Sequence, residues 1–209
     1  MVEIMKKRRI LAITAIFAAA VLIFTYFYIF VGFGQKKMDA SEAALRQQYI
    51  EAAEKWLGSN ESDGSHKPII DLYNSHTPLA QGYAVKYSDA WCSAFVSAVA
   101  IDLGWTDIIP TECGCQRHIQ LFQSINRWEE DDRYIPSPGD LIFYSSKGAK
   151  SFGGNTGWSD HVGIVVSVQG QYITTIEGNI NNQVAYRHIL VGDPKIRGYG
   201  LPDFASKCN

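Results

Sequence analysis

The pattern of apolar and polar residues divides the chain into helices in its first part and strands in its last. Apolar residues at helical spacing predict a helix over residues 38–57, with Tyr49 and Trp56 on its apolar stripe. A second amphipathic helix is predicted over residues 117–128. From residue 141 onward, short apolar runs separated by turn residues predict strands.

The most informative predicted helix is the stretch SDAWCSAFVSAVAIDLG, residues 88–104. Ser88 or Asp89 is expected to cap its N-terminus, and Gly104 stands where a helix often stops in the left-handed conformation. Cys92 then falls in the first turn, where the helix dipole favours a thiolate over a thiol. A cysteine on an apolar helix is more often a small buried hydrophobic residue, so this stretch alone does not establish a nucleophile.

Two later strands, HVGIVVSV and QYITTIEGN, are joined by Gln169-Gly170 and predict a β-hairpin. Side chains alternate between the faces of a strand, so His161 and Gly163 share one face. A tight turn places Glu177 opposite His161 or one residue away, within hydrogen-bond reach. Gly163 leaves room for another part of the chain to approach closely.

Cys92, His161 and Glu177 together suit a thiol hydrolase. The histidine can accept the thiol proton, and the acid can hold the tautomer and the orientation of the ring. Taken singly, His161 could be a hydrogen-bonded core histidine and Glu177 a carboxylate at the rim. Together they predict acyl transfer, with thiolate attack on an amide carbonyl and backbone N–H groups near the helix start as oxyanion donors.

The residues that carry this chemistry also resemble a known family. The stretches are WCSAFVSAVA around Cys92, SPGDLIFY at 137–144, DHVGIVVSV at 160–168 and ITTIEGN at 173–179. In this order they resemble the CHAP family of cysteine, histidine-dependent amidohydrolases/peptidases, distant relatives of NlpC-type and papain-like enzymes. The resemblance covers residues 48–199.

The resemblance implies an α+β fold of the papain-like CHAP type, with N-terminal helices packed on a small antiparallel β-sheet. It implies that Cys92 is the nucleophile, His161 the general base and Glu177 the orienting acid, with Asn179 as a further polar catalytic group. It also implies a substrate, the stem peptides or cross-bridges of bacterial peptidoglycan, cut by an amidase or an endopeptidase.

The N-terminal segment predicts a membrane anchor. Residues 1–9 contain four consecutive basic residues, and residues 10–33 carry no charge. A helix of that length spans roughly 36 Å, enough to cross a bilayer core of about 30 Å. A cleaved signal peptide is the alternative, but its apolar core is shorter, roughly 7–15 residues. We therefore expect a cytoplasmic N-terminus, a single span, a linker or helix over residues 34–47, and an extracytoplasmic domain over residues 48–209.

Charge and cysteine content narrow the possible partners. Residues 1–37 carry six Lys/Arg and one Glu, a balance of +5, and the rest carries 13 Lys/Arg and 20 Asp/Glu, a balance of −7. An acidic main domain argues against nucleic-acid binding. Cys113 and Cys115 would need two further ligands to hold zinc, so we expect no metal and no cofactor. One of them could form a disulfide with Cys208, or all could be free thiols.

Two other functions remain open from the sequence. A catalytically silent module could bind wall peptides or serve as a scaffold in an envelope-spanning apparatus, such as a secretion or conjugation machine. A transferase could pass the acyl group to an amine instead of water, because both compete for the same thioester.

Overall fold

The computed structural model describes residues 39–208 apart from 132, 146–149, 152–153 and 156. The helices are α2 (Ala40–Glu54), α3 (Lys67–Ser75), α4 (Cys92–Asp102) and α5 (Cys115–Ser124), with 3-10 turns η1 (Ala80–Gly82) and η2 (Phe204–Lys207). The main sheet contains β1 (Trp128–Glu129), β2 (Leu141–Tyr144), β5 (His161–Gln169), β6 (Tyr172–Ile180), β7 (Gln183–Leu190) and β8 (Ile196–Gly200). A separate pair consists of β3 (Lys150–Ser151) and β4 (Gly154–Asn155).

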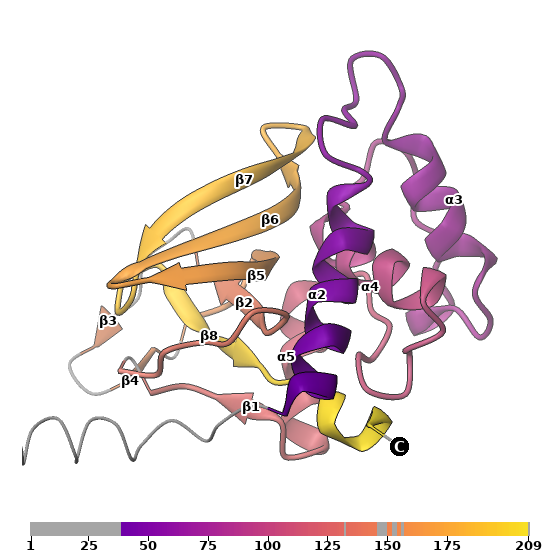
Figure 1. Ribbon diagram of the computed structural model, residues 1–209. Coiled ribbons are helices and arrows are strands. Elements are labelled where there is room, and N and C mark those ends of the chain that lie inside the picture. Colours follow the sequence, from indigo (N-terminus) through magenta and orange to yellow (C-terminus); the bar gives the residue numbers. More distant parts are fainter. Residues whose placement is uncertain (1–38, 132, 146–149, 152–153, 156, 209) are drawn as a thin grey trace, which may run out of the picture. The chain divides into compact units, whose positions relative to one another are not determined.

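The main sheet is antiparallel, with strand order β1-β8-β2-β5-β6-β7. The helices gather on one side of it (Figure 1). α4 contacts β5 and β6 directly, and α2 and α3 pack against α4. The predicted α+β architecture, helices on a small antiparallel sheet, is therefore confirmed for the described part of the chain.

α4 lies at the centre of the fold. Its first nine residues, 92–100, are all buried, so it is enclosed on every side and is not amphipathic. The predicted cap was wrong, because the helix begins at Cys92 and its N-cap is Trp91, which makes no side-chain cap bond. The carboxylate of Asp89 instead accepts hydrogen bonds from the Lys86 N–H and the Tyr83 hydroxyl. Gly104 has the left-handed backbone expected of it, with φ 67°.

The β5–β6 hairpin contains an irregularity that decides which residues face one another. Near its turn, Gln169 pairs with Tyr172, but farther along Ile164 pairs with Ile176 because the register shifts by one residue. Extended by one residue, this register places Glu177 opposite Gly163. Our prediction that Glu177 lies opposite His161, or one residue away, was therefore wrong by one residue. The bulge nevertheless keeps Glu177 on the face that carries His161.

Two helix ends also differ from the prediction. α2 ends at Glu54 and α5 ends at Ser124, and Trp128 lies in β1, where it pairs with Gly200. Helical spacing alone cannot separate the last turn of a helix from a short strand that follows it.

A buried ion pair ties α2 to the turn before β2. Arg46 donates to the Asp140 carboxylate and to the Pro138 carbonyl, both at 2.9 Å. Tyr134 donates to the other Asp140 oxygen at 2.9 Å.

The boundary that we expected between residues 47 and 48 falls inside α2, which runs through both residues without a break. Residues from Ala40 onward form one compact unit.

The expected membrane span over residues 10–33, and the flanking residues 1–9, lie outside the described residues. In the range that is described, we find no helix that is both long enough and apolar enough for a membrane crossing. The anchor thus stays a prediction.

Candidate active site

Cys92 is positioned by a close approach between α4 and β6. Gly178 makes this approach possible, because a Cβ there would lie 2.5 Å from the Cβ of Phe95 and 2.8 Å from the Trp91 ring. Trp91 is fixed in turn by donating its indole N–H to Glu61 at 3.0 Å. The glycine of the E-G-N stretch therefore brings the first turn of α4 against the sheet, and Cys92 with it.

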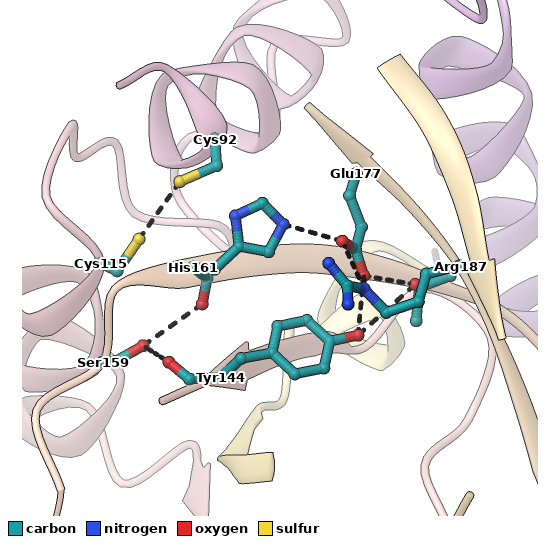
Figure 2. Close-up of polar contacts among 8 residues, drawn as sticks. Cys92, Cys115, Tyr144, Ser159, His161, Glu177 and Arg187 are labelled. Atoms are coloured by element: carbon teal, nitrogen blue, oxygen red, sulfur yellow. Dashed lines mark hydrogen bonds and ion pairs between the residues drawn. The ribbon is translucent and has the colours of Figure 1, made fainter. Parts of the chain in front are cut away.

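His161 opens β5, and its imidazole lies between Cys92 and Glu177 (Figure 2). The ring Nε2 is hydrogen-bonded to Oε2 of Glu177 at 2.7 Å, and the Nδ1 edge is turned toward Cys92. The backbone at this point is fixed by the pairing of His161 with Tyr144 and by Ser159, whose hydroxyl donates to the Tyr144 carbonyl at 2.9 Å. The predicted hydrogen bond between His161 and Glu177 is thus present.

Glu177 is fully buried, and its carboxylate accepts hydrogen bonds from several neighbouring side chains. Oε1 accepts from the Thr175 hydroxyl at 2.6 Å and from the Tyr144 hydroxyl at 2.8 Å. Arg187 donates its Nε to both carboxylate oxygens, at 2.9 and 3.0 Å. A buried carboxylate stays ionised only when it is paired and hydrogen-bonded, and this network supplies both conditions.

The electrostatics favour a thiolate–imidazolium pair. The pKa of Cys92 is held well below its usual range, chiefly by a hydrogen bond from Cys115 and also by His161, while burial opposes the shift. Burial by itself lowers the pKa of His161, but hydrogen bonds with Cys92 and Glu177 outweigh it and raise that pKa to about 9. Both pKa shifts favour a Cys92 thiolate beside a protonated His161.

Two cavities flank the site. One, of about 560 Å³, is lined by Cys92, Cys115 and Trp158 among others. The other, of about 490 Å³, is lined by His161, Arg187 and others. Asp160 borders both cavities.

Asn179 shares the second cavity with His161. It lies near the end of β6 in the left-handed conformation, with φ 60°, where the pairing of β6 with β7 shifts. Among the described residues, no hydrogen bond joins its side chain to Cys92, His161 or Glu177. A catalytic role for Asn179 stays a prediction.

The sequence reasoning missed three residues of the site: Tyr144, Arg187 and Cys115. Tyr144 ends a strand that was predicted, and Arg187 lies in a region predicted only as further strand. Both residues reach Glu177 because their strands, β2 and β7, lie beside β5 and β6 in the sheet. The residue pattern of one strand does not show which strands are its neighbours. Cys115 was considered as a metal ligand, a disulfide partner of Cys208 or a free thiol, but not as a neighbour of Cys92, yet its sulfur lies 3.5 Å from that of Cys92.

All four cysteines are free thiols, which is the second of the two alternatives left open by the sequence. Cys208 instead directs its thiol to the Phe204 carbonyl at 3.6 Å. Within the described range, no three His, Cys, Asp or Glu side chains are grouped as metal ligands would be.

A cysteine thiolate at a helix N-terminus, beside an imidazolium held by a buried carboxylate, is typical of cysteine hydrolases. Comparison with protein families agrees with this class. Residues 82–179 match the family model of the CHAP domain, a range that contains Cys92, His161, Glu177 and Asn179. The chain is therefore similar to the CHAP domain over this range, which is slightly less than half of its length.

Solved structures show weaker similarity. An NlpC/P60 family protein from Bacillus cereus ATCC 10987 is 14% identical, with a TM-score of 0.43 over 74% of this chain and 39% of the other. Ly7917 is 17% identical, with a TM-score of 0.37 over 54% and 53%. Ly7917 with the hydrolyzing product of MDP is 15% identical, with a TM-score of 0.37 over 75% and 62%.

The present chain spans less than two thirds of each of these solved proteins. No curated protein matches it.

Proposed function

We propose that this protein is a peptidoglycan hydrolase that cleaves amide bonds of the wall peptide by a thiol mechanism. Cys92 is the nucleophile, His161 the general acid and base, and Glu177 the orienting acid. The observation that carries the proposal is the position of the His161 ring, which faces Cys92 on one edge and bonds Glu177 at 2.7 Å on the other. The match of residues 82–179 to the CHAP domain supports the same assignment.

The first half of the reaction forms a thioester. The Cys92 thiolate attacks the amide carbonyl, and the oxygen gains negative charge. N–H groups in the first turn of α4 have no acceptor within the helix, and Trp91 supplies no side-chain cap, so they are free to stabilise this oxyanion. His161 then gives its proton to the leaving amine as the C–N bond breaks.

The second half consumes water. Neutral His161 takes a proton from a water molecule, and the resulting hydroxide attacks the thioester carbonyl. The C–S bond breaks, a carboxylic acid leaves, and Cys92 and His161 return to the ion pair. Glu177 holds the ring through both halves and stabilises its charged form.

We further propose that residues 10–33 anchor the protein in a bacterial cell membrane, with the catalytic domain on the extracytoplasmic side. The basic cluster before an uncharged run of 24 residues supports this orientation. Such an enzyme would open the wall locally for an envelope-spanning apparatus, for example in secretion or conjugation. Finding the protein freely secreted, with its first ~30 residues removed, would contradict the anchor.

The test is mass spectrometry of purified peptidoglycan after digestion with the purified full-length protein, beside Cys92→Ala. New amino termini within stem peptides or cross-bridges identify an endopeptidase, and free lactyl groups on the glycan identify an amidase. We expect one of these from the wild type and neither from the variant. No product from a folded wild type would refute hydrolysis and favour a silent wall-peptide-binding module.

A further inference from the structure

A second thiol lies in contact with the proposed nucleophile. The sulfurs of Cys92 and Cys115 are 3.5 Å apart, and both residues are buried, at 4% and 7% exposure (Figure 2). Each cysteine is the first residue of its helix, α4 or α5. The two helix N-termini therefore point their thiols at one another.

The segment before Cys115 is fixed to α4 by a buried carboxylate and its backbone. Oε1 of Glu112 accepts from the N–H groups of Cys113 and Gly114, at 2.8 and 3.1 Å. The hydroxyls of Ser93 and Ser97, both on α4, donate to the Glu112 carbonyl at 3.0 and 2.9 Å. The buried hydrogen bonds of Glu112 therefore hold the segment that carries Cys115 against α4, and this keeps the two sulfurs close together.

The two thiols have opposite character. The hydrogen bond between them lowers the pKa of Cys92 and, together with burial, raises the pKa of Cys115 well above its usual range. Cys92 is the thiol that reacts first with an oxidant, because susceptibility to oxidation follows thiolate character. Cys115 keeps its proton and stands ready as the second thiol.

We propose that Cys92 and Cys115 form a modification site, at which a hydroperoxide oxidant converts the pair to a reversible disulfide. The proposal rests on the proposed function in one respect, that Cys92 is the nucleophile and its loss stops cleavage. The disulfide itself requires only the two sulfurs and the oxidant.

The chemistry balances in two steps. The Cys92 thiolate attacks one peroxide oxygen, the O–O bond breaks, and a sulfenic acid forms while an alcohol or water leaves. The Cys115 sulfur then attacks the Cys92 sulfur, the S–O bond breaks, and the leaving hydroxide takes the Cys115 proton as water. The two thiols have given two electrons to the peroxide.

Bond formation needs a modest movement. The sulfurs must close from 3.5 Å to a bond length of about 2.05 Å. Both cysteines line the cavity of about 560 Å³, so a small peroxide or a thiol reductant can reach them. Thiol exchange with such a reductant restores both thiols and, with them, the nucleophile.

The test treats the purified full-length protein with hydrogen peroxide and then with dithiothreitol. Cleavage of the chain after Glu112 separates Cys92 from Cys113 and Cys115, which trypsin would leave in one peptide. After peroxide, we expect a disulfide-linked peptide pair that contains Cys92 and Cys115, together with loss of wall cleavage. After reduction, we expect the two free thiols and wall cleavage to return. Absence of the linked pair in peroxide-treated wild type would overturn the proposal.

Variants separate the second thiol from its neighbours. Cys115→Ser keeps a hydroxyl donor beside Cys92 but cannot form the disulfide. After peroxide and dithiothreitol, each protein regains a fraction of its own untreated rate, and this fraction should be roughly tenfold smaller in Cys115→Ser than in wild type. Cys92 of the variant should then be found as sulfinic acid. Cys113→Ser and Cys208→Ser should behave as wild type. Equal recovery in Cys115→Ser, or loss of the linked pair in Cys113→Ser, would contradict the assignment.

The mass readout is independent of wall cleavage. A linked pair in a protein that cuts no peptidoglycan would refute the proposed function and leave the modification site standing. Wall cleavage by a protein that never forms the linked pair would support the proposed function and refute the modification site.

Discussion

The side chain of Glu177 crosses β5 directly over Gly163. A Cβ placed on Gly163 would lie 2.5 Å from the Cγ of Glu177, closer than two such carbons can approach. The carboxylate needs this passage because Glu177 faces Gly163 in the register and must reach His161, two residues away along the strand. The absent side chain at Gly163 therefore makes the His161–Glu177 hydrogen bond possible.

Gly163→Ala should impair catalysis more than folding. The added methyl group displaces the Glu177 carboxylate from His161, and we expect kcat/KM to fall on the order of 10²-fold, as for other losses of an orienting group. Peptidoglycan cleavage and thermal unfolding measure the two effects. Ser167→Ala on the same strand is the control and should retain activity. Full activity in Gly163→Ala would show that the Glu177 contact is dispensable.

The wild-type protein should be active over a broad pH range with an alkaline limit near pH 9. The pKa of His161 is raised to about 9, so above that pH the ring loses the proton that it must give to the leaving amine. The acid limit should lie well below the usual thiol range, because the pKa of Cys92 is lowered. The measurement is kcat/KM against pH. An alkaline limit near the ordinary histidine pKa, about 6.5, would contradict the ion pair.

Glu177→Gln should move the alkaline limit to lower pH. The carboxylate raises the pKa of His161, and an amide of the same size removes that charge while keeping the volume. We expect kcat/KM at neutral pH to fall on the order of 10²-fold, with the alkaline limit shifted downward. An unchanged pH profile with reduced activity would assign Glu177 a packing role only.

Asp140→Asn should destabilise the fold, because it removes the buried partner of Arg46 and leaves only the Glu42 carboxylate, one turn away on α2, to balance its charge. Leaving a buried charge with no partner costs about 3–5 kcal/mol in the free energy of unfolding, and because Glu42 stays in place we expect a loss at or below the lower end of that range. Denaturant unfolding measures it, with Asp102→Asn on an exposed position of α4 as the matched control. A loss no larger than that of the control would show that the Arg46 pair contributes little.

The local parts of the site could be predicted from the sequence. Strand alternation placed His161 and Gly163 on one face, and the glycine indicated the close approach that Glu177 makes. The register could not be predicted, because the bulge in β5 depends on packing against neighbouring strands. Arg187 and Cys115 were missed for a related reason. Each reaches the site through a tertiary contact, from a strand or from the start of a helix whose own residue pattern gives no sign of it.

The predicted N-cap of α4 was wrong for a local reason. Asp89 is a good capping residue by type, but its carboxylate is occupied by Lys86 and Tyr83, so the helix starts later at Cys92. The later start places Cys92 at the first helical position, which strengthens the argument from the helix dipole.

The most direct test of the thiol mechanism is limited alkylation of the wild-type protein with iodoacetamide at neutral pH. Mass spectrometry follows each of the four cysteines while peptidoglycan cleavage is assayed in parallel. We predict that Cys92 reacts first, since it is the thiolate, and that cleavage falls in proportion to its modification. A protein with Cys92 fully carbamidomethylated that still cleaves the wall at the wild-type rate would contradict the mechanism.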